Sequence, residues 1–463
     1  MEEDVFDLLV IGGGPAGYHA AIRASQLRGK VCLVEKEERL GGVCLNRGCI
    51  PTKALVKGTE VLYSIKRARD FGIEGDNFKL NFSSLTKRKE AVVKTLTQGL
   101  SNLFKSYKIE LIKGFGKIVA PQKVEVEGRI IEAKNILIAT GSRPLSFPPF
   151  ILDGERVITT KEALSLNEVP ESMVIVGGGV NGCEFAHIFN SLGCKMSIVE
   201  MMENILPGED TEIATYLARL LNKEGTALYL GRKVEEVKLR EGNVWCKLSS
   251  GEEISGEKLL VCVGRKPNIE DIGLDKIGIK IKKGRIWTNE KMQTNIPSIY
   301  AAGDVVDAPM LAHVAFKEGI IAAENALGGN SLMDYAVIPS CVFTHPEVAS
   351  VGLTEKEARE RYNNKVKIGR FPFMANGKAL CEGEEAGFIK IVARSKNEKI
   401  LGVHIIGSHA SELISEGALA ISFKATLKNI SGIIHPHPTL SEVLMEAASD
   451  GRSEAIHLPR KRI

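Results

Sequence analysis

Positions 5–17 read VFDLLVIGGGPAG, and they carry the strongest structural signal in the chain. The apolar run Val5–Ile11 is typical of a buried parallel strand. Three glycines follow it directly with the spacing Gly12-x-Gly14-x-x-Gly17. Glycines at these places let the backbone approach a pyrophosphate, which the N-terminus of the next helix attracts. The stretch therefore predicts the start of a dinucleotide-binding unit.

The residues after this stretch complete the unit. An alanine-rich helix is expected from Ala16 to Leu27, and a strand from Val31 to Val34 ends at Glu35. Glu35 stands 18 residues after Gly17, close to the offset of an acid that binds a ribose hydroxyl. A glycine motif alone is weak, but strand, helix and acid in this order make dinucleotide binding the favoured interpretation.

A second copy of the pattern lies between residues 173 and 200. A strand precedes the spacing Gly177-x-Gly179-x-x-Gly182, a helix follows, and a further strand ends at Glu200, again 18 residues after the last glycine. A degenerate second copy without a ligand is the alternative, but its glycines and acid are intact. We therefore predict an α/β fold with two Rossmann-like dinucleotide-binding domains.

The rest of the first domain is read from its apolar pattern. A long amphipathic helix is expected over Phe82–Phe104. A small β segment is expected over Lys117–Ala133, and a separate buried strand begins at Ile136 and ends at Thr140-Gly141. The segment Phe147–Pro149 has the character of a crossing between domains.

After the second unit the pattern changes twice. The strand Ser298–Ala302 runs into Gly303-Asp304 and is expected to return the chain to the first domain. From about residue 339 the apolar pattern alternates as antiparallel strands do, and an α+β domain without a glycine motif follows. The predicted domains are a first nucleotide-binding domain at 1–145, a second at 146–268, a central domain at 269–338 that completes the first site, and a C-terminal domain at 339–463.

Two cysteines stand five positions apart in GGVCLNRGCIPTK, residues 41–53. Five residues of straight helix rise about 7.5 Å, whereas a disulfide accepts a Cα separation of at most about 6.8 Å. Cys44 and Cys49 can therefore bridge only if the helix start is bent, and Gly48 permits a bend. A helix N-terminus also favours a thiolate. A redox-active disulfide is the favoured interpretation, and two buried free thiols are the alternative.

A candidate proton acceptor lies in HPHPTLSE, residues 435–442. Two prolines restrict the backbone around His437, and Thr439 is expected to cap the helix that carries Glu442, a carboxylate suited to orienting the imidazole. Thiol–disulfide exchange needs a base for the incoming thiol. A structural role for His437 is one alternative. A His435/His437 metal pair is another, but no third ligand stands near in sequence and we expect no metal.

Composition excludes several classes of protein. A net charge of +4 is too small to indicate nucleic-acid binding. No signal peptide and no apolar run long enough to cross a bilayer is visible. We expect a cytoplasmic protein, or a mature form already processed, with neither nucleic acid nor membrane as partner.

Two dinucleotide sites beside a disulfide indicate an electron relay, in which one nucleotide carries a hydride and a flavin exchanges electrons with sulfur. The acids Glu35 and Glu200 disfavour a 2′-phosphate, and Met201-Met202 occupy the positions where an NADP site would have arginine. We therefore expect NAD rather than NADP.

Residues 41–53, the two glycine motifs, Ala302-Gly303-Asp304 and residues 435–442 together resemble the flavin-dependent pyridine nucleotide–disulfide oxidoreductases. The resemblance covers nearly the whole chain, and Phe343–Ala349 is similar to the start of that family's dimerisation domain. It implies an FAD domain, an NAD domain, a central domain and a dimerisation domain, with FAD and NAD as cofactors.

The resemblance also assigns cofactor contacts. For FAD and its surroundings it implies Gly12, Gly14, Pro15, Ala16, Gly17, Glu35, Gly42, Lys53, Gly116, Thr140, Gly141, Asp304 and Ala312. For NAD it implies Gly177, Gly179, Gly182, Glu200, Val234 and Gly264, and it pairs Lys53 with Glu184 near the flavin.

By the same resemblance, Cys44 exchanges with a substrate dithiol, Cys49 contacts the flavin, and His437 with Glu442 reaches the disulfide of the other subunit in a homodimer. The members that it is most similar to oxidise protein-bound dihydrolipoyl groups. The implied partner is a lipoyl-bearing acyltransferase or a glycine cleavage carrier protein. Two alternatives stay open: an NAD(P)H-dependent reductase of another disulfide such as glutathione, and a mainly structural docking subunit of a multienzyme complex.

Overall fold

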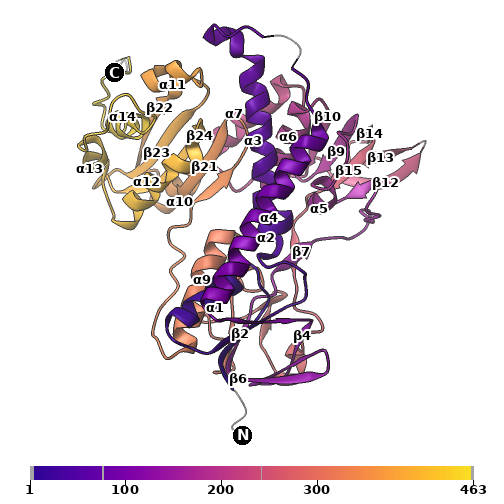
Figure 1. Cartoon of the computed structure of the whole chain (residues 1–463). Coiled ribbons are helices and arrows are strands. Elements are labelled where there is room, and N and C mark those ends of the chain that lie inside the picture. The colour runs from indigo at the N-terminus through magenta and orange to yellow at the C-terminus, as the bar shows by residue number, and fades with distance from the viewer. Residues whose placement is uncertain (1–4, 76–77, 241, 460–463) are drawn as a thin grey trace.

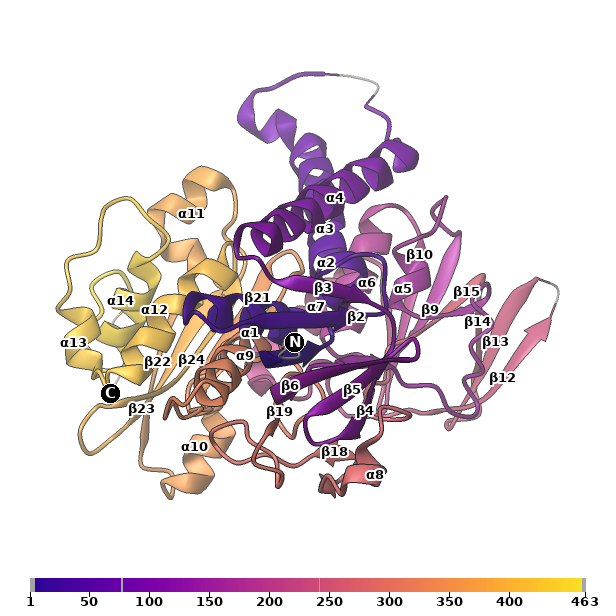
Figure 2. The same ribbon diagram turned by 60° about the horizontal axis from the view of Figure 1, so that its bottom comes forward.

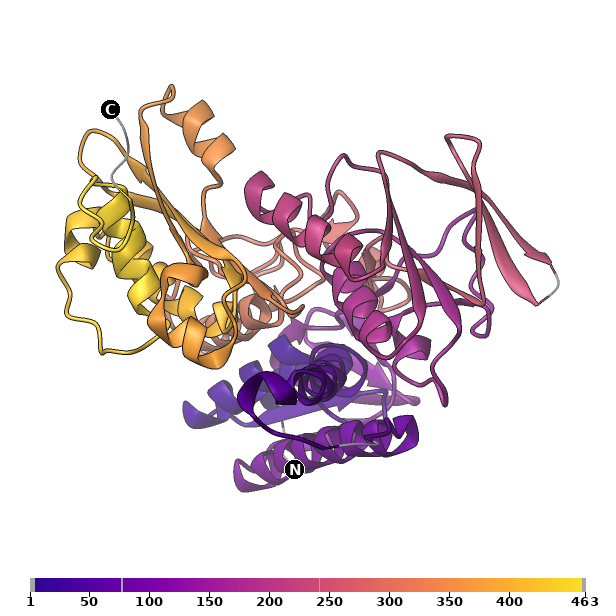
Figure 3. The ribbon, with the colours of Figure 1, turned by 90° about the horizontal axis from the view of Figure 1, so that it is seen from above.

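The computed structural model describes residues 5–75, 78–240 and 242–459. Its three largest sheets each have a hydrophobic core, and they surround the central helices α2 (Gly42–Arg47) and α3 (Cys49–Lys66) (Figure 1). Seen from above in Figure 3, the indigo-to-purple N-terminal part, the magenta second unit and the orange-to-yellow C-terminal part meet at this centre. Leu55 and Val56 of α3 join the core of the second unit.

The first sheet has the order β3-β2-β1-β6-β5-β4, and β19 also pairs with β6. Figure 2 shows these strands below α4. β1 pairs with β2 and β6 in parallel, and β19 joins β6 in parallel after the whole second unit has been built, which confirms the expected return of the chain. The strands are β1 (Phe6–Ile11), β2 (Val31–Glu35), β3 (Glu110–Lys113), β4 (Gly116–Ala120), β5 (Lys123–Val126), β6 (Arg129–Ile138) and β19 (Ile299–Ala301).

Three helices complete the first core. α1 (Pro15–Gln26) and α9 (Ala312–Ala326) pack so closely that a Cβ on Gly319 would overlap the carbonyl oxygen of Ala16. The predicted amphipathic helix is α4 (Phe82–Ser106), whose last turns bury Leu100 and Phe104 against the sheet.

One expectation for this sheet is wrong. The small β segment and the separate strand at Ile136 are not distinct, because β6 runs unbroken from Arg129 to Ile138. Its first half pairs antiparallel with β5, and its second half pairs parallel with β1. No glycine or proline interrupts it, so one strand serves a solvent-facing hairpin and the buried core in succession.

The second unit repeats the parallel plan. Its sheet has the order β11-β10-β9-β15-β8, and an antiparallel ribbon β12-β13-β14 adjoins it. The chain passes between the two units at β7 (Ser142–Pro144) and β16 (Arg265–Pro267), which pair antiparallel. The other elements are β8 (Val157–Ile158), α5 (Thr160–Ala163), β9 (Ser172–Val176), α6 (Val180–Ser191), β10 (Lys195–Glu200), α7 (Thr211–Lys223), β11 (Ala227–Leu230), β12 (Val234–Arg240), β13 (Asn243–Leu248), β14 (Glu253–Gly256) and β15 (Lys258–Val261).

The C-terminal part is the predicted α+β domain. Its antiparallel sheet has the order β20-β21-β24-β23-β22, and α12 to α14 pack against it. The elements are β20 (Ser340–Val342), β21 (Glu347–Gly352), α10 (Glu355–Arg361), β22 (Val366–Pro372), α11 (Gly377–Glu382), β23 (Phe388–Arg394), β24 (Ile400–Gly407), α12 (Ala410–Ser422), α13 (Leu427–Ser431) and α14 (Glu442–Asp450).

Within the described ranges, no helix is both long and apolar enough to cross a membrane.

Candidate active site

The first glycine turn has the backbone that dinucleotide binding requires. Gly12 has a positive φ of +104°, which favours glycine, and a Cβ on Gly17 would overlap the Gly12 carbonyl oxygen. Gly14 is the N-cap of α1 and Pro15 is its first residue, so the first N–H groups of the helix have no side-chain cap. These groups are free to bind an anionic pyrophosphate.

Glu35 lies where the spacing places it, at the end of β2 and beside this turn. Its buried carboxylate accepts hydrogen bonds from the backbone N–H of Gly13 (2.7 Å) and of Glu37 (2.8 Å). The turn and the acid are thereby joined into one rigid cradle at the carboxyl ends of the parallel strands, the edge at which such sheets bind nucleotides.

The other residues predicted for the first nucleotide meet at the same edge. A Cβ on Gly116 would lie 3.1 Å from Ile11 and 3.3 Å from Val34, the last apolar residues of β1 and β2. Thr140 and Gly141 follow β6, Asp304 follows β19, and Ala312 begins α9. A Cβ on Gly42 would lie 2.7 Å from the Cα of Gly14, so the cysteine segment lies directly over the turn.

Sequence reasoning missed a polar network around Asp304. Its carboxylate accepts a hydrogen bond from the Ser142 hydroxyl, and Arg265 Nε donates to that hydroxyl at 2.7 Å. Glu318 of α9 accepts the backbone N–H of Gly303 at 2.6 Å. Residues Gly141–Pro144 and Gly264–Pro267 follow equivalent strands of the two units and have similar sequences. This repeat is the signal that could have identified Ser142 and Arg265.

The two cysteines lie on either side of a break between two helices. Cys44 belongs to α2, Cys49 is the first residue of α3, and Gly48 between them leaves helical geometry with φ −145° and ψ −113°. The predicted bend is therefore confirmed. Both residues are free thiols in this structure, as in the reduced form of a redox pair, and the disulfide stays a prediction.

The two thiols differ in acidity. A hydrogen bond from the Cys44 thiol lowers the pKa of Cys49 to about 7. Burial opposes this shift, and the Lys53 ammonium adds to it. The same hydrogen bond and burial raise the pKa of Cys44 far above its ordinary value. The pair therefore favours a thiolate on Cys49, and this asymmetry was not visible in the spacing.

Lys53 is held by a residue of the second unit. Its Nζ lies 2.9 Å from both carboxylate oxygens of Glu184, a buried residue of α6. Glu184 also accepts the backbone N–H of Phe343 at 2.9 Å, and the Lys53 Nζ lies 4.5 Å from the centre of the Phe343 ring. The implied Lys53–Glu184 pair is present, and Phe343 was a contact that sequence reasoning did not identify.

The second glycine turn reproduces the first. Gly177 has φ +102°, a Cβ on Gly182 would overlap the Gly177 carbonyl oxygen, and Gly179 is the N-cap of α6. The buried Glu200 accepts the N–H of Gly178 at 2.7 Å and that of Met202 at 2.8 Å, just as Glu35 does in the first unit. The second copy therefore keeps the geometry of a nucleotide cradle.

The surroundings of this second cradle are open. Among the described residues, no heavy atom lies within 4 Å of a Cβ placed on Gly179 or on Gly264. Met201, whose exposed fraction is 59%, flanks Glu200, and Val234 packs under the strand ends with Val199.

The proposed base and its orienting carboxylate are together. His437 Nδ1 lies 2.9 Å from Glu442 Oε1, and Glu442 Oε2 accepts the backbone N–H of Thr439 at 2.8 Å. Despite burial, these contacts hold the pKa of Glu442 below its ordinary value. The expected cap is wrong: Ser441 is the N-cap of α14, because the Thr439 hydroxyl donates instead to the Pro436 carbonyl.

The structure does not bring this base to the cysteines of its own chain. The His437 side chain is 78% exposed. Its segment connects α13 to α14, which lie at the left of Figure 1, whereas α2 lies at the centre. His435 pairs with Glu416 at 3.0 Å, and the described part of the chain holds no group of three or more ligating side chains for a metal.

The cradles fit dinucleotides at both units. Each offers uncapped helix N–H groups for phosphate, a glycine turn that a Cβ would close, and a buried carboxylate for a ribose hydroxyl. The residues of the first unit, lying under the thiol pair, suit a flavin nucleotide, and those of the open second unit suit an exchangeable one.

Comparisons with known proteins agree with this geometry. Residues 6–319 match the family described as pyridine nucleotide-disulphide oxidoreductase, and residues 338–448 match its dimerisation domain. Dihydrolipoyl dehydrogenase of Bacillus subtilis is 44% identical, over 98% of this chain and 99% of that protein. The mitochondrial dihydrolipoyl dehydrogenase of Sus scrofa is 42% identical, over 95% and 89%. The crystal structure of LpdA from Mycobacterium tuberculosis superposes with a TM-score of 0.88 at 27% identity, covering 95% of this chain and 98% of that one.

Proposed function

The chain belongs to the pyridine nucleotide-disulphide oxidoreductase family, among the dihydrolipoyl dehydrogenases, and we propose that it oxidises protein-bound dihydrolipoyl groups to lipoyl with NAD+ as acceptor. The observation that carries the proposal is the unequal thiol pair, Cys44 and Cys49, directly over the first glycine turn. Glutathione reduction is the weaker candidate, because Met201 and Met202 leave no arginine for a 2′-phosphate.

The acidity of the two thiols assigns their roles. In the oxidised pair, a substrate thiolate attacks Cys44 Sγ, the Cys44–Cys49 bond breaks, and Cys49 departs as a thiolate. A lower pKa makes a better leaving thiolate, so Cys49 is the sulfur that leaves and Cys44 is the one that exchanges. The second substrate thiol then displaces Cys44, which closes the lipoyl disulfide and leaves Cys44 as a thiol.

The cofactors would occupy one cradle each. FAD fits the covered first unit and NAD the open second one, and bound FAD would supply the two-electron relay between the thiols and NAD+. Within the chain, Lys53 and Glu184 hold charge beside the Cys49 thiolate, and the glycine turns and acids position the two nucleotides.

The proton acceptor requires a second copy of the chain. His437 is held by Glu442 but exposed and remote from its own cysteines, so it is suited to take the proton of the incoming thiol at the partner's Cys44. A homodimer built through the matched dimerisation domain would supply this contact.

The macromolecular partner follows from the substrate. A lipoyl-bearing acyltransferase or a glycine cleavage carrier protein would present the dihydrolipoyl group, and docking without catalysis is the alternative role. The expected cytoplasmic location stays a prediction, because the similar proteins include a bacterial and a mitochondrial one.

The test is spectroscopic. Anaerobic reduction of the purified flavoprotein with one equivalent of NADH should produce a long-wavelength charge-transfer band from the Cys49 thiolate. Because the pKa of Cys49 is about 7, the band should grow as the pH rises through about 7 and fade below it. A protein without flavin, or a flavin without this band, would contradict the proposal. Turnover with dihydrolipoamide against glutathione, and with NAD+ against NADP+, decides between the substrates.

A further inference from the structure

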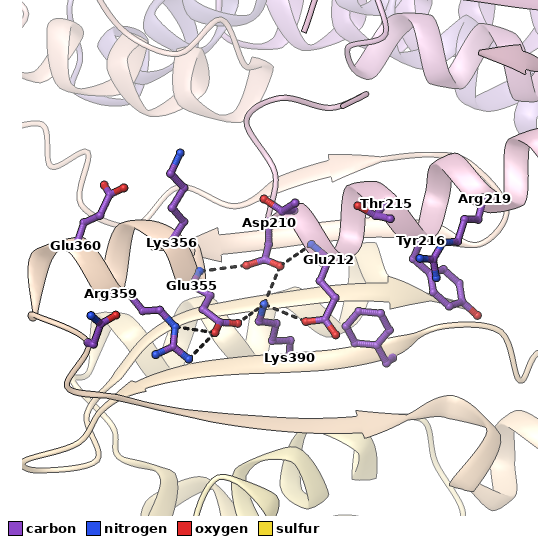
Figure 4. Close-up of a pocket in the computed structure, with 13 residues that line it drawn as sticks. Asp210, Glu212, Thr215, Tyr216, Arg219, Glu355, Lys356, Arg359, Glu360 and Lys390 are labelled. Carbon is purple, nitrogen blue, oxygen red and sulfur yellow. Dashed lines mark hydrogen bonds and ion pairs between the residues drawn. The ribbon is translucent and has the colours of Figure 1, made fainter. Parts of the chain in front are cut away.

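An open cleft of about 810 Å³ lies where α7 of the second unit meets α10 and β23 of the C-terminal part (Figure 4). Charged side chains from both sides converge at its floor. Neither the glycine cradles nor the thiol pair includes any of these residues, so the mechanism above leaves this cluster without a role.

Lys390 of β23 is the centre of the cluster. Its side chain is only 3% exposed, and its Nζ lies 2.9 Å from Asp210, 3.1 Å from Glu212 and 2.6 Å from Glu355. Asp210 and Glu212 belong to the start of α7, and Glu355 is the first residue of α10. One buried ammonium of β23 thus joins the starts of α7 and α10, and its partner Asp210 is 180 positions away in the chain.

Asp210 joins the same elements from the other side. As the N-cap of α7, its Oδ1 accepts the backbone N–H of Glu212 at 3.1 Å, and its Oδ2 accepts the backbone N–H of Glu355 at 3.1 Å. A single carboxylate therefore receives hydrogen bonds from the first turns of two helices and from Lys390. The Asp210 carboxylate therefore holds the N-terminus of α7 against the N-terminus of α10.

Further contacts also join α7 to the C-terminal part at this boundary. Arg370 of β22 pairs with Glu212 at 2.9 Å and with Glu355 at 3.3 Å. The Tyr216 hydroxyl of α7 accepts the backbone N–H of Gly387 at 3.0 Å, and its ring meets that of Phe388 edge-on at 5.7 Å.

The three central members of the network, Asp210, Glu355 and Lys390, each have a pKa shifted toward the charged form. Burial alone would raise the pKa of Asp210 and Glu355, but Lys390 and the neighbouring donors hold both below their ordinary values. Burial would lower the pKa of Lys390, but Glu355 and Asp210 raise it above its ordinary value. Buried ion pairs contribute little net stability because desolvation opposes them, whereas they are strict about geometry.

We propose that Lys390 is a positioning residue for the nicotinamide half of the reaction. The second unit is joined to the first at the β7–β16 pair and through α3, whose Leu55 and Val56 enter its core. The Lys390 network ties the far side of that unit to the C-terminal sheet and so sets where its nucleotide meets the first cradle. The thiol pair lies on α2 and α3, and its link to the second unit, the Lys53–Glu184 pair, shares no residue with the Lys390 network, so its exchange with substrate should depend less on this tie.

The inference rests on the proposed function, and two half-reactions of the FAD-loaded protein test it separately. In Lys390→Met, flavin reduction by NADH should slow roughly ten- to a hundredfold, because a displacement of about 1 Å between reacting groups can cost about a hundredfold. Flavin reduction by dihydrolipoamide should stay within about twofold of the unmodified protein. Hydrogen exchange at the first-turn amides of α7 should accelerate, and Lys390→Arg should restore most of the NADH rate.

A matched control is Lys367→Met, which breaks the Lys367–Glu398 pair (2.8 Å) within the C-terminal sheet and should change neither half-reaction. Asp210→Asn is the second variant and should give the same split as Lys390→Met. Equal loss of both half-reactions, or an unchanged NADH half-reaction despite faster exchange in α7, would overturn the inference. Failure of dihydrolipoamide to reduce the unmodified protein would instead refute the proposed function.

Discussion

The first glycine turn lies beneath the cysteine segment, whereas the second turn faces open space. Gly42 closes over Gly14 in the first unit, but among the described residues nothing approaches a Cβ placed on Gly179 in the second. The backbones of the two turns are nevertheless alike, with φ +104° at Gly12 and +102° at Gly177. In each unit the acid, Glu35 or Glu200, accepts the N–H of the residue after the first glycine.

The difference teaches that one backbone motif can occur in two different surroundings. In the proposed function, the turn and its acid would provide affinity for a dinucleotide in either unit, and the segment after the second strand would decide how the nucleotide is retained. In the first unit that segment carries Cys44 and Cys49, and in the second it carries the exposed Met201 and Met202. Paired substitutions at equivalent positions can separate the two contributions.

The largest effect is expected where the units differ most, at the thiols over the first turn. Cys49→Ser should lower turnover by roughly a thousandfold or more, because the electron path through sulfur is lost. Cys381→Ser, which alters an exposed cysteine on α11, is the control and should keep normal turnover. Normal turnover in Cys49→Ser, measured with dihydrolipoamide and NAD+, would contradict an electron path through this sulfur.

The next effect tests the shared backbone. Gly17→Ala and Gly182→Ala each place a methyl group against a carbonyl oxygen, which should cost about 3 kcal/mol, or about a hundredfold in affinity. We expect Gly17→Ala to be purified with little flavin, and Gly182→Ala to keep its flavin but bind NAD+ weakly. Flavin-to-protein ratios and the Kd of NAD+ measure this.

Gly99→Ala is the control for these variants. An added Cβ meets nothing there, inside the helix α4, so both nucleotides should bind normally and stability should rise slightly. If Gly17→Ala and Gly182→Ala lose the same nucleotide, the assignment of one cradle to each cofactor is wrong.

A smaller effect is expected at the acids. Replacing Glu35 or Glu200 with Gln removes a charge-assisted acceptor, at about 1.5 kcal/mol or roughly tenfold. Glu200→Gln should raise the Kd of NAD+ without loss of flavin, and Glu35→Gln should speed flavin release without changing the Kd of NAD+. Crossed effects, with each variant altering the other nucleotide, would contradict the comparison.

The smallest effect concerns the open edge of the second unit. Met201→Arg adds a guanidinium beside the ribose position, where an exposed contact with a 2′-phosphate is worth up to about 1 kcal/mol. The ratio of kcat/KM for NADP+ to that for NAD+ should rise up to about fivefold. Met374→Arg, at an exposed methionine of the C-terminal part, should leave the ratio unchanged.

Local patterns predicted the cradles well. The spacing of glycines and acids identified Glu35 and Glu200, and the distance argument for Cys44 and Cys49 required the helix break found at Gly48. Each of these features depends on a few consecutive residues, or on one strand and one helix of ordinary length. The continuous β6 was mispredicted because pairing with β5 and then with β1 keeps it extended, and the Ser441 cap was mispredicted because the Thr439 hydroxyl donates to Pro436 instead.

The sequence by itself therefore determined the two nucleotide-binding units, the thiol pair and the segment of the proposed base, since backbone conformation near glycine and proline is restricted locally. Only the tertiary structure decided which side chains meet across elements: Glu184 with Lys53, Arg265 with Ser142, and Lys390 with Asp210. These pairs join residues 123 to 180 positions apart, and their contact depends on how three separately built sheets pack. Packing also placed the cysteine segment over one turn and left the other turn open, the difference that separates two otherwise equal cradles.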